Sequence, residues 1–135
     1  RNCAEAGIKD VGIIGVDSGW ELYIGGNGGI KTEAGEFFVK VQTAEEVMEY
    51  SLAFLQLYRE EAFYLERTVH YMQRVGMEHI KAEVLSDAEK RKALHERLLY
   101  ALSFEQDPWK ERIEKAELKQ EFRRIAVKQI EEASV

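Results

Sequence analysis

The sequence predicts an α+β protein, in which short antiparallel strands, two of them forming a hairpin, occupy the N-terminal third and a helical region follows. Nine of the ten glycines lie within the first 41 residues, among short apolar and β-branched stretches. Beyond them, apolar residues recur at intervals of three and four, the spacing that places them on one face of a helix. We therefore expect two regions: residues 1–42, with strands and a glycine-rich loop, and residues 43–135, with helices.

Three strands are expected in the first region. The run 11–16 (VGIIGV) is apolar and rich in β-branched residues, and 20–24 (WELYI) alternates between its two faces. Residues 17–19 (DSG) between them are a turn signal, which predicts a hairpin. A third strand is expected over 37–41 (FFVKV), after the loop 25–29 (GGNGG).

The first helix is marked by a capping box. Thr43 is placed to accept a hydrogen bond from the amide of Glu46, and the Glu46 side chain is placed to reach back. The apolar stripe behind this box runs from Val47 to Met72. It fits either one long helix or two helices with a break near Glu61.

Further helices are expected along the rest of the chain. Gly76 fits the position just after a helix, and a short helix is expected over 77–85. A second capping box at 86–89 (SDAE) opens the next helix. The pair 107–108 (DP) is a typical helix start, and we expect a charged helix over 109–135.

The composition narrows the classes of protein. The net charge is −6 and no basic stripe is present, which argues against a nucleic-acid partner. No apolar run reaches the roughly 18 residues that a membrane span needs, and no secretory signal sequence is recognisable. A single cysteine forms no internal disulfide, which fits a reducing compartment, and we expect a cytoplasmic protein.

The single cysteine, Cys3, stands in an informative pattern. Taken alone, a free cysteine is most often a small buried hydrophobe. Here it is followed, after six residues, by 10–13 (DVGI). This spacing resembles the second half of the sirohaem and iron–sulfur signature of the nitrite and sulfite reductases. In that signature, two cysteines with three residues between them are followed, after six more residues, by an acidic, an apolar, a small and an apolar residue.

The resemblance extends over most of the chain, through residues 1–112. The stretches 12–38 (GIIGVDSGWELYIGGNGGIKTEAGEFF), 54–76 (FLQLYREEAFYLERTVHYMQRVG) and 101–112 (ALSFEQDPWKER) are similar to the large subunits of assimilatory NAD(P)H-dependent nitrite reductases. Because the sequence starts inside the signature and without Met, we interpret it as a C-terminal fragment. The first cysteine of the pair is then expected two residues before Arg1.

The resemblance implies specific cofactor residues. In this family four cysteines hold a 4Fe–4S cluster, and the second of the close pair also bridges to the sirohaem iron, which assigns Cys3 as a metal ligand. Asn2, beside it, and Gly26 and Asn27 are the further expected cofactor-binding residues. The amides of the loop 25–29 are suited to cradle sirohaem carboxylates, although a plain turn between strands explains the same glycines.

The activity implied by the resemblance is the six-electron reduction of nitrite to ammonium. Electrons pass from NAD(P)H through FAD and the cluster to sirohaem, and a nitrite reductase small subunit is the implied partner. The stripe from Val47 to Met72 must bury against something, so homo-oligomers are a further expectation. With one cysteine, the fragment itself is expected to be inactive and to hold no cofactor.

Two alternatives stay open at the level of sequence. The first is a fragment of a sirohaem sulfite reductase, which shares the signature. The second is a non-catalytic helical docking module whose Cys3 is simply buried. The histidines His70, His79 and His95 lack the spacing of a metal site, and we expect them at polar positions on helix faces.

Overall fold

The structure, a computed structural model, describes residues 3–115 and 117–118 of the 135-residue chain. The chain divides into two compact units, the first ending at Leu102 and the second beginning at Ser103. The first unit contains a three-stranded antiparallel sheet and four helices, so the expected α+β class is confirmed.

The sheet forms as the sequence predicts. A short 3-10 helix, η1 (Ala6–Ile8), precedes β1 (Val11–Val16), β2 (Gly19–Ile24) and β3 (Glu36–Val41), and the strands lie in the order β1-β2-β3. The predicted hairpin closes where Val16 pairs with Gly19. Gly19 has a φ of +122°, and an added Cβ would lie 2.3 Å from the carbonyl oxygen of Val41, so this turn requires glycine.

An irregularity in β3 brings one more aromatic side chain into the core. The register between β2 and β3 shifts between Leu22 and Tyr23, as at a β-bulge. Phe38, beside the shift, is buried and packs on Phe54 of the first helix, with ring centroids 6.2 Å apart. A strict period-two pattern does not predict this inward turn.

The first long helix, α1 (Ala44–Glu61), begins at the predicted capping box. The amide of Glu46 donates to the Thr43 hydroxyl at 3.1 Å, and the amide of Thr43 donates to the Glu46 carboxylate at 3.1 Å. The helix ends at Glu61, so the two-helix alternative is correct. The apolar stripe is continuous in sequence, but Leu65, inside the break, has a φ of +62°, which a right-handed helix does not contain.

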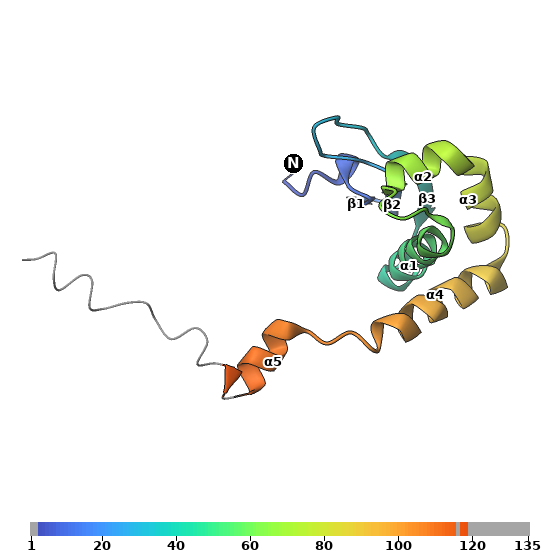
Figure 1. Cartoon of the computed structure of the whole chain (residues 1–135). Helices are drawn as coiled ribbons and strands as arrows, with labels where there is room; N and C mark the ends of the chain where they lie inside the picture. Colours follow the sequence, from blue (N-terminus) through green and yellow to red (C-terminus); the bar gives the residue numbers. More distant parts are fainter. Residues whose placement is uncertain (1–2, 116, 119–135) are drawn as a thin grey trace, which may run out of the picture. The chain divides into compact units, whose positions relative to one another are not determined.

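Two short helices follow the break. They are α2 (Thr68–Val75) and α3 (Met77–Val84), separated by Gly76, whose φ of +84° ends the first of them as expected. The helix α1 contacts β2, and Figure 1 shows α2 above α1 and α3 to its right. The apolar side chains of α1 and of the sheet share one core, with Leu22, Ile24, Ala53 and Phe54 fully buried.

The fourth helix, α4 (Ala88–Leu102), packs on α1 but starts differently from the prediction. The expected capping box with Ser86 is wrong, because the Ser86 hydroxyl donates back to the Lys81 carbonyl. The carboxylate of Asp87 caps instead, accepting from the amides of Glu89 at 2.9 Å and Lys90 at 3.2 Å. Asp87 directly precedes the helix, so its carboxylate reaches the first free amides.

The second unit contains α5 (Pro108–Glu114). Asp107 caps it as predicted, accepting from the amides of Trp109 at 2.9 Å and Lys110 at 3.3 Å, with Pro108 in the first turn. The expectation of one helix over 109–135 is wrong, because α5 ends at Glu114, where the next residue, Lys115, has an extended backbone. Residues 116 and 119–135 lie outside the described residues. In the described ranges, none of the helices combines the length and hydropathy of a membrane span.

Candidate functional site

Cys3 is an exposed, free thiol, three residues before the first residue of η1. It is therefore not the small buried hydrophobe that one alternative expected. The neighbouring Asn2 lies outside the described residues. Figure 1 shows this N-terminal segment, in blue, beside the connection between β2 and β3.

Backbone hydrogen bonds join the segment after Cys3 to the glycine-rich connection. The amide of Gly25 donates to the carbonyl of Asp10, and the amide of Gly26 donates to the carbonyl of Lys9, both at 3.0 Å. Gly35, at the far end of the same connection, donates to the carbonyl of Gly7 at 2.8 Å. The cysteine segment and the predicted loop thus form one structure, although they are separate in sequence.

Gly26 is needed for this close approach. It is buried, and a Cβ added there would lie 2.6 Å from the carbonyl carbon of Ile8 and 2.6 Å from the carbonyl oxygen of Lys9. Both are backbone atoms, which cannot swing aside as a flexible side chain does. The glycine therefore lets two main chains touch, which is a role that the motif alone did not reveal.

Asn27 closes the connection on itself. Its backbone pairs with that of Glu33 through two hydrogen bonds of 2.9 Å, and its side-chain amide donates to the carbonyl of Lys31 at 2.7 Å. The amides of Gly25, Gly26 and Asn27 are thus engaged with protein carbonyls. This arrangement is what a structured turn between strands requires, and the cofactor contacts of Gly26 and Asn27 stay predictions.

Asp10, the acid of the signature, binds the start of α2. Nη2 of Arg67 lies 3.1 and 3.0 Å from its two carboxylate oxygens, and the hydroxyl of Thr68 donates to the first of them. These partners lie 57 and 58 positions away in sequence. Sequence reasoning used Asp10 only to match the signature and missed this contact. The acidic position itself was the one available signal.

The donor set decides how much of a cluster this chain can hold. Within residues 3–115 and 117–118, no three side chains of His, Cys, Asp or Glu come together as a metal site. The sequence has one cysteine, whereas a 4Fe–4S cluster uses four thiolates. A whole cluster therefore does not fit this chain alone, and Cys3 fits one of the four ligand positions.

The histidines take structural positions. Nε2 of His79 lies 2.9 and 3.0 Å from the two carboxylate oxygens of Glu61, and the hydroxyl of Tyr71 donates to the same carboxylate at 2.7 Å. Burial, with this hydrogen bond to Glu61, raises the pKa of Tyr71 above its ordinary value. His70 is exposed on α2. The expectation of polar helix positions is confirmed for His70 and His79.

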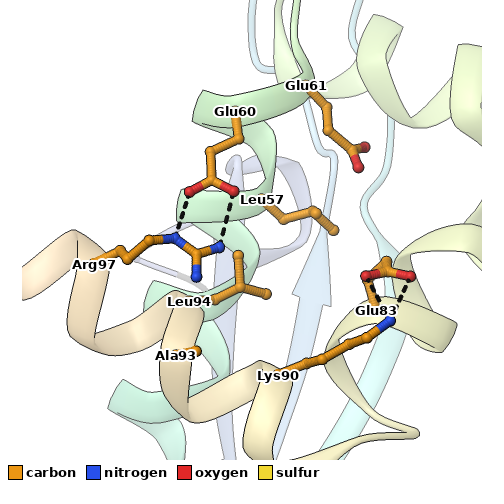
Figure 2. Close-up of a pocket in the computed structure, with 8 residues that line it drawn as sticks. All are labelled: Leu57, Glu60, Glu61, Glu83, Lys90, Ala93, Leu94 and Arg97. Carbon is orange, nitrogen blue, oxygen red and sulfur yellow. Dashed lines mark hydrogen bonds and ion pairs between the residues drawn. The ribbon is translucent and has the colours of Figure 1, made fainter.

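A pocket of about 280 Å³ opens between α1, α3 and α4, and Figure 2 shows the side chains that line it. Its charged groups are paired. Arg97 forms two hydrogen bonds with Glu60, at 2.7 and 2.9 Å, and lowers the pKa of that carboxyl. Lys90 contacts Glu83 at 3.2 Å. These pairs fasten α4 to its neighbours, and the arrangement indicates a structural role.

A second hollow, of about 260 Å³, lies between the sheet and the start of α1. The residues that line it are Ile13, Trp20, Ala44, Val47 and Met48. All five are apolar, so this hollow offers no acid, base or ligand for chemistry. It is a surface for packing.

The comparison with known families decides what the Cys3 segment belongs to. Residues 1–92 match the family described as the nitrite and sulphite reductase 4Fe-4S domain, and this range includes the sheet, Cys3 and Asp10. The chain belongs to this family. No solved structure matches it.

Relatives within the family favour one branch. The chain is 53% identical, over 90% of its length, to a nitrite reductase [NAD(P)H] from Bacillus subtilis (strain 168). It is 35% identical over 64% of its length to the nitrite reductase (NADH) large subunit of Escherichia coli (strain K12). An assimilatory-type sulfite reductase from Nitratidesulfovibrio vulgaris is more distant, at 29% over 62% of the chain.

The match covers a small part of each nitrite reductase. The chain spans 15% of the length of the Bacillus subtilis enzyme and 10% of the length of the Escherichia coli subunit. The family match and these relatives together confirm the expected resemblance to this reductase family.

Proposed function

We propose that this chain is one segment of an NAD(P)H-dependent nitrite reductase and supplies one thiolate, Cys3, to the metal centre of that enzyme. The observation that carries the proposal is the 53% identity over 90% of the chain to a nitrite reductase [NAD(P)H]. The exposed thiol of Cys3, two residues before the hydrogen-bonded turn that begins at Glu5, supports it. The sulfite reductase alternative has a weaker basis, because the relative that bears this name is more distant.

The chain's own contribution is to place a soft sulfur ligand. A thiolate binds iron strongly and suits the link between a 4Fe–4S cluster and a sirohaem iron. Within the proposed enzyme these groups, with FAD and NAD(P)H elsewhere, supply the six-electron reduction of nitrite to ammonium. The other three thiolates come from outside this chain, so the chain alone is inactive and holds no cluster. A small subunit and a cytoplasmic location belong to the same proposal.

The role of Cys3 is tested in the intact reductase by Cys3→Ser. The variant should lose cluster iron, acid-labile sulfide and nitrite reduction together, because a serine hydroxyl is a poor iron ligand. Ala4→Ser is the matched control, since Ala4 is the exposed neighbour and gains the same side chain. Full iron and full nitrite reduction in Cys3→Ser would contradict the proposal.

The substrate and the assembly need separate measurements. The intact enzyme should turn over nitrite faster than sulfite at equal concentration, and the reverse order would favour the sulfite reductase alternative. Size-exclusion chromatography tests self-association, for which the apolar hollow beside Trp20 is one surface. A folded protein that binds neither iron nor sirohaem in its intact form would favour the non-catalytic docking module.

A further inference from the structure

We propose that Asp10 is a positioning residue: its carboxylate fastens the segment that carries Cys3 to the start of α2. We call the contact of Asp10 with Arg67 and Thr68 the clamp. Its effect on the metal centre rests on the proposed function, whereas the clamp itself is a property of this chain. Asp10 lies in the signature, but its partners Arg67 and Thr68 lie far along the chain, in a helix that the signature does not include.

The contact with Thr68 is the shielded part of the clamp. Thr68 is only 3% exposed, and its hydroxyl donates to the Asp10 carboxylate. A hydrogen bond to an ionised acceptor is among the stronger ones in proteins. The pair of Arg67 with Asp10 is more open to water, with side chains 57% and 45% exposed, so it contributes less. The hydroxyl of Thr68 is therefore the contact to remove.

The segment between Cys3 and Asp10 is short and internally bonded. The amide of Ile8 donates to the carbonyl of Glu5 at 3.0 Å, and the amide of Lys9 donates to that of Ala6 at 3.4 Å. Ala6 is buried on β1, where a Cβ added at Gly12 would lie 1.9 Å from its carbonyl oxygen. These hydrogen bonds hold residues 5–9 together as one turn. A displacement of Asp10 should therefore also displace the chain that leads back to Cys3.

The connection between α1 and α2, on the other side of the clamp, is held by its own hydrogen bonds. The residues between α1 and α2 are held by Glu66, whose carboxylate accepts from Arg74 at 2.8 and 2.7 Å and from the amide of Phe63 at 2.9 Å. The hydroxyl of Tyr58 donates to the carbonyl of Glu66. Arg67 follows directly, so Asp10 grips a part of the chain that is already ordered by its own bonds.

The clamp is tested by hydrogen exchange on the full 135-residue chain, comparing Thr68→Val with Thr68→Ser. Valine keeps the shape and removes the hydroxyl, and serine retains the hydroxyl. In Thr68→Val the amides of Gly25 and Gly26, which donate to Asp10 and Lys9, should exchange about tenfold to a hundredfold faster, as expected for losing a hydrogen bond to a charged group. Thr68→Ser should stay within about threefold of the unaltered chain.

Two further variants keep the result interpretable. Asp10→Asn removes the charge of a half-exposed side chain and should accelerate the same amides. Arg59→Gln is the control, because Arg59 is an exposed arginine that contacts Gln56. Unchanged exchange at Gly25 and Gly26 would overturn the proposal. So would an equal acceleration in the core of α1, because that pattern means general destabilisation.

The positioning of Cys3 is read in the intact reductase by electron paramagnetic resonance of the reduced cluster. Thr68→Val should alter the signal while the bound iron is retained. Thr68→Ser, which keeps the hydroxyl, should give the signal of the unaltered enzyme. An identical spectrum in Thr68→Val would overturn the positioning role. A reductase that lacks a cluster even without substitution would refute the proposed function instead, and the exchange experiment on this chain would still decide the clamp.

Discussion

Gly26→Ala tests the contact that joins the Cys3 segment to the sheet. The new methyl group would meet backbone atoms of Ile8 and Lys9, and these must retreat from 2.6 Å to the 3.4 Å at which ordinary contact begins, by roughly 0.8 Å. Gly29→Ala is the matched control. Its new methyl group would lie 3.5 Å from the nearest atoms, on the Asn27 side chain, and neither glycine has a positive φ.

The size of the effect follows from two terms. Forcing an extra methyl group into a packed site costs about 1–3 kcal/mol. The retreat also strains the hydrogen bonds from Gly25 and Gly26, each of which contributes about 1 kcal/mol. We expect Gly26→Ala to be about 2–4 kcal/mol less stable than Gly29→Ala. Both alanines restrict the unfolded chain alike, by about 0.4–1 kcal/mol, so this contribution cancels in the comparison.

Urea unfolding of both variants, followed by circular dichroism, measures this difference. In a unit that ends at Leu102, a loss of this size should also lower the melting temperature by roughly 10 °C or more. Free energies of unfolding within about 0.5 kcal/mol of each other would refute the reasoning, because that is the ordinary range for a surface change. Such a result would mean that the two main chains separate without cost.

Two other predictions concern the cap of α1 and the ion pair between Glu66 and Arg74. Thr43→Ala removes the capping hydroxyl of α1 and should lower the free energy of unfolding by about 1 kcal/mol in urea titration, while Thr43→Ser should be nearly neutral; equal loss in both would show that the cap is not the cause. The pKa of Glu66 is lowered to about 2, mainly by the hydrogen bond from Arg74. Because this folded-state pKa lies below the ordinary value of 4.5, the stabilisation is complete above about pH 4.5 and is lost as pH falls toward 2. The free energies of unfolding of Glu66→Gln and of the unaltered chain, measured by urea titration, should therefore approach each other as pH falls from 4.5 to 2. A difference that stays constant with pH would contradict the assignment.

Local signals in the sequence were sufficient for most elements. The hairpin, the third strand and the caps at Thr43 and Asp107 depend on residues within a few positions of one another, and all are confirmed. The cap at Ser86 failed at the same scale, because two adjacent residues competed for the same amides and Asp87 was better placed. A sequence pattern identifies candidate capping residues but does not determine which side chain lies within hydrogen-bonding distance of the amides.

The candidate site was predictable in part. The spacing after Cys3 identified the family, and the glycines marked the loop, yet neither feature indicated that Gly26 touches the backbone of Ile8 and Lys9. The break after Glu61 was left open as well. An apolar stripe reports which face of a helix is buried and continues through a break without changing its spacing.

The sequence by itself thus determined the fold class, the hairpin, the helix caps at Thr43 and Asp107 and the signature around Cys3, because each is set by neighbouring residues. Only the tertiary structure decided where α1 ends, which glycine brings two main chains together, and that Asp10 grips Thr68 across 58 positions. The physical reason is that a side chain's local preference does not depend on its distant partner. A contact between remote segments exists only when the whole core has set the distance between them.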